Sequence, residues 1–297
     1  MGAKLIRPFV SIVIANYNYG RFLSEAIESV LSQSCQDFEL IVIDGGSTDN
    51  SVEIVKKYAE GNVVVGSRSR TEESPISYWV SEPDKGQSNA FNKGFAKARG
   101  RFLTWLNADD VMLPGTIEKL KTAAERHPEC EWFVGGCLWL DPEMRIVNCG
   151  RGRPFSERRY QAGEVSVWGP SSFFTKRLLN SVGGVDERFH YSMDMDLWLR
   201  FAHQQGARYL PFCDYAWGLR LHPDAKMSRQ GFLAAPDERQ KAAEEQKRRE
   251  VEWRKEQLKA RTFGPLARFL SVSWRQVLAA KVDLWRYRGK HYREVFS

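Results

Sequence analysis

Phe9-Val-Ser-Ile-Val-Ile-Ala15, followed at once by Asn16-Tyr-Asn-Tyr-Gly20, is the stretch that decides the fold. The first seven residues form a β-branched apolar run of strand length, which predicts a buried strand. Arg21–Gln33 comes next and repeats apolar residues at helical spacing, which predicts an amphipathic helix. A buried strand that leads into an amphipathic helix is the first unit of an alternating α/β domain.

The same alternation continues through the first half of the chain. The further expected strands are Phe38–Asp44, Ser77–Ser81 and Arg101–Leu106, and the expected helices are Thr48 to about Glu60, Gln87–Arg99 and one opened by Pro114. This βαβα order predicts an α/β fold with a mostly parallel, doubly wound sheet. Such a sheet binds ligands at the carboxyl ends of its strands. Four polar clusters fall at these ends: Asn16–Tyr19, Asp44–Gly46, Asp84–Gly86 and Asn107–Asp110.

Past Glu131 the pattern changes. The expected elements are a hairpin with strands Glu131–Leu140 and Arg145–Cys149, a helix from about Thr175, a helix over Met193–Gln204 and a strand over Ala207–Asp214. The turn signal of the hairpin is Asp141-Pro142-Glu143. The second half therefore predicts a smaller, mixed part that follows the parallel sheet.

Composition places the chain among globular proteins. It has 297 residues, of which 42% are hydrophobic and 27% charged, and this suits one large domain or a domain with an appendage. No stretch approaches the roughly 18 apolar residues that span a bilayer, and Met1–Arg7 does not begin a signal peptide. The five cysteines are odd in number and lack metal-ligand spacing, which is typical of reduced thiols. We therefore expect a cytoplasmic protein.

The net charge of +7 belongs to the C-terminal tail. From Asp237 onward there are 16 Lys and Arg against 9 Asp and Glu, so the preceding residues are neutral. We predict a catalytic domain over residues 1–232 and a basic, amphipathic helical tail over residues 233–297. Within the tail, Pro265–Arg288 places Trp and Leu among basic residues, which suits a helix at a membrane interface. The alternative is a helix packed on the domain or on a second subunit. Acidic residues are interleaved through the tail, so nucleic-acid binding is not expected.

Two carboxylate clusters and one histidine have the chemistry of a site. Asn107-Ala-Asp-Asp110 offers hard oxygen ligands that suit Mg²⁺ or Mn²⁺, although Asp is also common in turns. Asp194 and Asp196 begin a helix, where they either offset its dipole or supply a general base. Their i, i+2 spacing lets at most one face a cleft. His222 is a metal ligand or a core histidine.

Asp44 offers a further carboxylate at the end of a strand, before Gly45-Gly46. Such a group can accept the imide hydrogen of a pyrimidine base. The alternative is an Asp that only caps a helix or a turn.

Taken together and in order, these phrases resemble glycosyltransferase family 2, the inverting nucleotide-sugar transferases of the GT-A fold, which is Rossmann-like. The resemblance covers roughly residues 8 to 228. Its phrases are Val13-Ile-Ala-Asn-Tyr-Asn18, Val42-Ile-Asp-Gly-Gly-Ser-Thr-Asp49, Ser81-Glu-Pro-Asp-Lys-Gly-Gln87, Asn92-Lys-Gly94, Trp105-Leu-Asn-Ala-Asp-Asp110, Val182-Gly-Gly-Val-Asp-Glu187 and Met193-Asp-Met-Asp-Leu-Trp-Leu-Arg200.

The resemblance implies a role for each matching position. The donor-binding residues would be Ala15, Asn16, Tyr17, Asp44, Asp84, Lys85, Asn107, Ala108 and Asp109. Asp194 would be the catalytic base, and the metal ligands for Mn²⁺ or Mg²⁺ would be Asp109, His222 and Asn107. The loop Gly169–Ser172 would lie near the donor.

Three positions depart from the family pattern. Asn107 stands where the metal motif usually begins with Asp, Met193 replaces a Glu, and Gly45 precedes Gly46 where the family often has Asp-Gly. A neutral amide is a weaker metal ligand than a carboxylate, and Met193 places no like charge beside Asp194. At Gly45 a second nucleotide contact is missing.

We therefore expect an inverting glycosyltransferase that moves a sugar from a UDP, GDP or dTDP donor to a glycan or lipid-linked acceptor. A single base without a second nucleophile favours inversion. The tail and the family together favour cell-surface polysaccharide assembly, with peripheral attachment at the inner face of the membrane. The alternative is a catalytically inactive GT-A protein that serves as a binding or scaffold partner in a glycan assembly complex. A dehydrogenase or P-loop enzyme is disfavoured, because neither G-x-G-x-x-G nor G-x-x-x-x-G-K-[ST] occurs.

Overall fold

The structure, a computed structural model, describes residues 7–61, 74–153, 155, 167, 169–189, 193–204, 208–226 and 273–296. Its first half alternates strand and helix as the sequence predicts. The elements are β1 (Val10–Asn16), α1 (Gly20–Leu31), β2 (Phe38–Asp44), α2 (Ser51–Ala59), β3 (Tyr78–Ser81), α3 (Gln87–Lys97), β4 (Phe102–Asn107), β5 (Val111–Met112) and α4 (Thr116–Arg126). Pro114 does not open α4, because Gly115 intervenes with a left-handed φ of 70° and the helix begins at Thr116.

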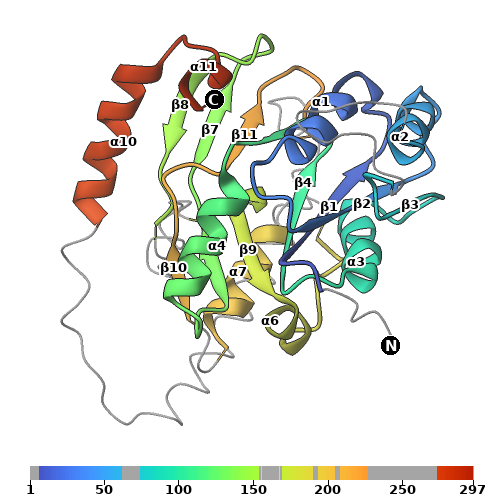
Figure 1. Ribbon diagram of the computed structural model, residues 1–297, viewed down its shortest axis with the longest axis horizontal. Coiled ribbons are helices and arrows are strands. Elements are labelled where there is room, and N and C mark those ends of the chain that lie inside the picture. Colours follow the sequence, from blue (N-terminus) through green and yellow to red (C-terminus); the bar gives the residue numbers. More distant parts are fainter. Residues whose placement is uncertain are drawn as a thin grey trace.

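The main sheet has seven strands in the order β10-β6-β9-β4-β1-β2-β3. Its remaining strands are β6 (Trp132–Val134), β9 (Ser172–Thr175) and β10 (Tyr209–Pro211). The strands β1 to β4 are all parallel, and only β9 runs antiparallel to its neighbours. After β3 the chain crosses back to place β4 on the other side of β1 (Figure 1). Ligands bind at such a switch point, beyond the carboxyl ends of the strands.

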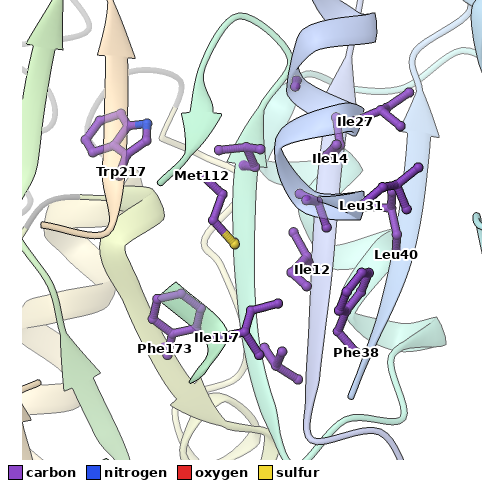
Figure 2. Close-up of a cluster of buried hydrophobic side chains, with 14 of the residues drawn as sticks. Ile12, Ile14, Ile27, Leu31, Phe38, Leu40, Met112, Ile117, Phe173 and Trp217 are labelled. Carbon is purple, nitrogen blue, oxygen red and sulfur yellow. The ribbon is translucent and has the colours of Figure 1, made fainter. Parts of the chain in front are cut away.

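Both faces of β1 are buried, which explains its unbroken apolar run. Ile12 and Ile14 point toward α1, where they meet Ile27 and Leu31 (Figure 2). Val13 and Ala15 point to the other face and join a second core. The first core takes side chains from α1, α2 and α4, and the second takes them from α3, α6 (Lys176–Ser181) and α7 (Met193–Ala202). The domain therefore has helices on both faces of a mostly parallel sheet.

A second sheet follows the order β5-β11-β7-β8. It contains β7 (Cys137–Leu140), β8 (Ile146–Gly150) and β11 (Trp217–Arg220). The expected hairpin forms between β7 and β8, but the expected strand Glu131–Leu140 is divided between two sheets. The division falls at Gly135-Gly136, where the chain passes so close to its neighbours that a Cβ on Gly136 would lie 1.8 Å from the carbonyl oxygen of Asp214.

The end of the tail packs on this second sheet. Helix α10 (Ser273–Tyr287) lies beside β8, and α11 (Tyr292–Phe296) follows it (Figure 1). Asp283 of α10 accepts a hydrogen bond from the Tyr215 hydroxyl at 2.7 Å and pairs with Arg151. The outer side of α10 exposes Val282 and Trp285, the latter by 87%. The tail residues 233–272 lie outside the described residues, and no helix in the described part is long and apolar enough to cross a membrane.

Candidate active site

The carboxyl ends of the parallel strands bring the predicted clusters together. Asn16 of β1 lies beside Asp44 of β2, and Asp44 lies beside Ser81 of β3. On the other side of β1, Ala15 pairs with Asn107 of β4. Clusters that are separated by up to about ninety residues in the sequence therefore share one edge of the sheet, as the sequence predicts.

Asp44 is the structural centre of this edge. Its carboxylate accepts five hydrogen bonds: from Asn16 Nδ2 at 2.6 Å, from the Gly46 and Ser47 amides at 3.2 and 2.9 Å, from Ser47 Oγ at 2.5 Å and from Ser81 Oγ at 2.6 Å. Burial alone would raise the pKa of Asp44, but the hydrogen bonds from Ser47, Ser81 and Asn16 outweigh it and lower the pKa. The expected contact with a nucleobase would require Asp44 to give up one of these bonds.

The loop after β1 carries the other predicted nucleoside contacts. Ala15 and Asn16 are buried, and Asn16 Oδ1 accepts no hydrogen bond from the described residues. Tyr17 is 58% exposed. It borders a cleft of about 530 Å³, which is lined by Tyr17, Asn18, Tyr19, Arg21, Asp49, Asn50 and Asp224.

Asp109 and His222 meet although 113 residues separate them in the sequence. Asp109 follows β4 and His222 follows β11, and their Oδ2 and Nε2 atoms lie 3.1 Å apart. The rings of Tyr19 and Phe22 enclose the imidazole. Burial and the charge of Asp109 raise the pKa of Tyr19 to about 12. This pair is the part of the predicted metal site that the structure assembles.

The third predicted ligand, Asn107, is differently engaged. Its Oδ1 accepts a hydrogen bond from Gln87 at 2.9 Å, and its Nδ2 donates to Asp110 at 2.7 Å. Asp110 is buried, and burial together with the charge of Asp109 raises its pKa well above the ordinary value. Ala108 is buried in the core. Among the described residues no three His, Cys, Asp or Glu side chains gather as a complete metal site.

The two aspartates at the start of helix α7 have different partners. Asp196 is buried and pairs with Arg200 at 2.6 Å, and Arg200 in turn donates to the carbonyl oxygens of Val182 and Gly184. Asp194 instead binds only the amide of Met195 through Oδ1, at 2.8 Å, among the described contacts. The other carboxylate oxygen of Asp194, Oδ2, accepts no hydrogen bond from the described residues.

The carboxylate of Asp194 is surrounded by protein atoms. Its Oδ2 faces Gly169, beside the ring of Trp105. Burial raises the pKa of Asp194, and the Met195 and Asp194 backbone amides and the charge of Lys226 offset this rise only in part. The neighbouring Met193 is buried, and its sulfur accepts a hydrogen bond from Ser88 Oγ at 3.1 Å. Met193, where the resemblance leads one to expect a Glu, is part of the hydrophobic core.

Sequence reasoning missed two side chains that connect these parts. Lys226 donates to Gln87 Oε1 at 3.0 Å, and Gln87 holds Asn107. The ammonium group of Lys226 is thereby held near enough to Asp194 to lower its pKa, and it could stabilise an anionic group there. Gln87 lies inside a phrase of the family pattern and Lys226 only within the span of the resemblance, but their mutual contact spans 139 residues and leaves no local signal. Of the predicted Asp84-Lys85 pair, Asp84 packs against Gly45, and Lys85 is exposed.

Comparison with known proteins supplies the context of this site. The family model described as "Glycosyl transferase family 2" matches residues 11–136. An uncharacterised glycosyltransferase of Mycobacterium tuberculosis (strain CDC 1551 / Oshkosh) is 32% identical over 201 residues, which are 66% of this chain and 69% of the relative. One of Nostoc sp. is 39% identical over 111 residues, which are 37% of this chain. The chain spans only 31% of the length of that second relative.

Among solved structures, a mannosyltransferase of Pyrobaculum calidifontis in complex with GDP-Man and Mn²⁺ superposes with a TM-score of 0.53. The match covers 74% of this chain and 59% of the mannosyltransferase, at 18% sequence identity. Likeness at this level of identity shows the shared fold.

Proposed function

Because the chain belongs to glycosyltransferase family 2 and has the GT-A fold, we propose that it transfers a sugar from a nucleotide-diphosphate sugar to an acceptor hydroxyl, with inversion at the anomeric carbon. The observation that carries this proposal is the state of Asp194. One of its carboxylate oxygens is unengaged among the described residues, and its pKa is raised by burial. A carboxylate in this state is a stronger base than an ordinary Asp.

Asp194 acts as the general base in this proposal. Its Oδ2 removes the proton of the acceptor hydroxyl as the oxygen attacks the anomeric carbon, and the nucleoside diphosphate leaves from the opposite side. Asp196 is occupied by Arg200 and supplies no second carboxylate for a covalent intermediate. A single displacement with inversion follows from one available base.

Asp109 and His222 fit a divalent cation. Carboxylate oxygen and imidazole nitrogen suit Mn²⁺, and Mg²⁺ is commonly bound through one or two carboxylates together with substrate phosphates. The two side chains would hold the ion, which when bound stabilises the negative charge of the leaving diphosphate. Gln87 fixes Asn107 beside this pair, and Lys226 adds a fixed positive charge. These residues orient the diphosphate whether or not Asn107 itself is a ligand.

For the acceptor we propose a glycan or lipid-linked chain of cell-surface polysaccharide assembly, reached at an anionic membrane surface. Support comes from the outer side of α10, where Val282 and Trp285 are exposed among Lys281, Arg286 and Arg288. Basic residues around an exposed Trp favour an anionic lipid interface. The packing of Asp283 on Arg151 keeps this side of α10 turned outward.

The experiment that tests the activity begins with nucleotides. A thermal-shift panel of UDP, GDP, dTDP and CMP, each with Mn²⁺ and with a chelator, identifies the base that stabilises the protein by mass action. Turnover of the matching nucleotide sugars is then measured for the wild type, Asp194→Asn and the control Glu143→Gln, an exposed carboxylate on the β7–β8 turn. We expect Asp194→Asn to keep its donor affinity and to lose about 10²- to 10⁴-fold in turnover.

Two results would count against the proposal. Full turnover in a folded Asp194→Asn protein would show that Asp194 is not the general base. Nucleotide binding without turnover, equal in the wild type and in both variants, would favour the inactive binding partner over the enzyme.

A further inference from the structure

Arg220 connects the two segments that carry Asp109 and His222. It is the last residue of β11, two residues before His222, and its side chain is buried. Its Nε atom donates to the carbonyl oxygen of Asp109 at 3.0 Å, and its backbone amide donates to Asp110 Oδ1 at 3.0 Å. The segment after β4 is therefore joined to the end of β11 twice at one residue, close to the pair that Asp109 and His222 form at 3.1 Å.

The guanidinium of Arg220 is fixed by further contacts. Its Nη2 atom pairs with Oε2 of Glu25 on α1, a partly buried carboxylate, and its Cζ atom lies 4.8 Å from the centre of the Phe22 ring. The N–H groups of a guanidinium lie in one rigid plane, so acceptors on two of its nitrogens fix its orientation. A buried guanidinium also needs partners for its donors, which makes rotation away from them costly. Arg220 is therefore a fixed donor to the backbone of Asp109.

Helix α11 packs on the residues that follow the same segment. Tyr292 is buried in one apolar cluster with Val111 and Leu113, and Val111 follows Asp110 directly. The Tyr292 amide donates to the Met144 carbonyl at 3.1 Å, which joins α11 to the β7–β8 turn. Helix α11 is therefore built into the same apolar core as β5.

Charged side chains connect α11 to Arg220. Arg293 Nε donates to the Tyr292 hydroxyl at 3.1 Å, and Arg293 Nη2 lies 3.7 Å from Glu25 Oε1. Burial raises the pKa of Tyr292, and the charges of Glu25 and Arg220 also act on it, so these groups lie close together. Glu25 thus lies between two arginines, one from α11 and one from β11.

We propose that Arg220 is a positioning residue for the metal site and that Glu25 and helix α11 hold it in place. The inference deepens the proposed function and rests on it, because it takes Asp109 and His222 as the ligands of the cation. By holding the Asp109 carbonyl, Arg220 sets the separation of the two ligand side chains before a cation binds. Residues that orient metal ligands typically change metal affinity by about 10- to 100-fold when they are removed.

The test measures Mn²⁺ binding to the full chain by electron paramagnetic resonance, in which the signal of free Mn²⁺ is lost on binding. Mn²⁺ is titrated in the presence of UDP, GDP or dTDP, whichever stabilises the protein. The melting temperature of the metal-free protein is measured in parallel, because a purely structural role would change this temperature and leave Mn²⁺ affinity unchanged.

The expected effects decrease with distance from Asp109. Arg220→Gln should raise the Mn²⁺ dissociation constant by about 10-fold or more. Arg220→Lys keeps the charge but loses the planar set of donors, so its dissociation constant should fall between those of the wild type and Arg220→Gln. Glu25→Ala leaves Arg220 without its carboxylate and should raise the constant by about 3- to 10-fold. Tyr292→Leu, which keeps an apolar side chain in the cluster, should raise it by a smaller factor.

Arg99→Gln is the matched control. Arg99 also donates from Nε, at 2.8 Å, to a buried carboxylate, that of Glu39, but this pair lies at the amino ends of β2 and β4. Loss of the pair should lower the melting temperature of the metal-free protein, because it leaves the Glu39 charge buried without its partner. We expect the Mn²⁺ affinity of Arg99→Gln to equal that of the wild type.

The outcomes separate this inference from the proposed function. If folded Arg220→Gln binds Mn²⁺ as the wild type does, or if Arg99→Gln weakens Mn²⁺ binding equally, the inference is wrong and the glycosyltransferase proposal stands. Should Arg220→Gln fail to fold, wild-type Mn²⁺ affinity in Glu25→Ala would overturn the inference. Unchanged affinity in Tyr292→Leu would remove α11 from it. If the wild type with its nucleotide binds no Mn²⁺, the proposed metal site is wrong and the inference falls with it.

Discussion

Asp44 and Asp194 are two carboxylates at the same end of the sheet, and their environments are opposite. Asp44 accepts five hydrogen bonds and has a lowered pKa, whereas Asp194 accepts one from its own helix and has a raised pKa. Protein atoms crowd both groups, so burial alone does not distinguish them. The number of donors does, because each hydrogen bond to the charged form favours it.

The difference divides the site into two regions. At β1, β2 and β3 every donor meets an acceptor around Asp44, which fixes the shape of the edge. After β4 and β11, Asp109 and His222 lie 3.1 Å apart, and at the start of α7 Asp194 accepts a hydrogen bond from a backbone amide; protein donors do not saturate these side chains. Hydrogen bonds within the protein hold the first region in place, whereas in our proposal the second region carries the catalytic base and the metal ligands.

The largest expected effect is on stability. Asp44→Ala leaves the buried donor of Asn16 and the half-buried hydroxyls of Ser47 and Ser81 without their acceptor. We expect the free energy of unfolding to fall by about 3–5 kcal/mol, measured by urea denaturation. The matched variant Asp194→Ala should change it by less than about 1 kcal/mol, since it breaks no long-range hydrogen bond. Equal losses of unfolding free energy in both variants would contradict the difference between Asp44 and Asp194.

A second prediction concerns the metal. His222→Ala removes the proposed nitrogen ligand next to Asp109, so the Mn²⁺ concentration needed for half-maximal stabilisation by the bound nucleotide should rise by roughly 10- to 100-fold or more. Phe22→Leu, which changes a ring packed on the imidazole, serves as the control and should change it much less. An unchanged metal requirement in His222→Ala would show that the imidazole is not a ligand.

The opposite pKa shifts predict a pH dependence. In the proposed mechanism turnover requires ionised Asp194, so the acid limb of kcat/KM should lie above the pKa near 4 of an ordinary Asp and should disappear in the residual activity of Asp194→Asn. Steady-state rates between pH 4 and 8 would check it. An acid limb at or below about pH 4 would contradict the raised pKa.

Stability should depend on pH with opposite signs at the two residues. The pKa of Asp44 is lowered in the folded state, so its contribution is present above the ordinary Asp pKa and is lost as the pH falls through the folded value. The pKa of Asp194 is raised, so ionisation destabilises the fold, and stability is regained as the pH falls through its folded pKa. Asp194→Asn should therefore flatten the stability profile above the ordinary Asp pKa in acid titrations of the melting temperature.

The smallest effect on stability is expected at α10. Trp285→Ser changes an exposed side chain, so the free energy of unfolding should move by less than about 0.5 kcal/mol. Co-sedimentation with vesicles that contain anionic lipid should nevertheless fall several-fold. Unchanged sedimentation would leave α10 as a helix that only packs on the second sheet.

Much of the fold could be predicted because it depends on local periodicity. The apolar run of β1 and the helical spacing of α1 are properties of short segments, and both elements form where expected. Where prediction failed, a long-range contact decided the outcome. The strand expected at residues 131–140 divides at Gly135-Gly136 because the carbonyl oxygen of Asp214, distant in sequence, approaches Gly136.

By itself the sequence determined the order of strands and helices, the polar clusters at the strand ends and the family, since all of these are written in short phrases. Only the tertiary structure decided which carboxylates are saturated by hydrogen bonds and which keep an oxygen without a protein donor. Asp44 is saturated by Ser81 from another strand, and His222 reaches Asp109 across 113 residues. The physical reason is that hydrogen-bond saturation and pKa depend on neighbours that packing supplies, and neighbours distant in the chain leave no local pattern.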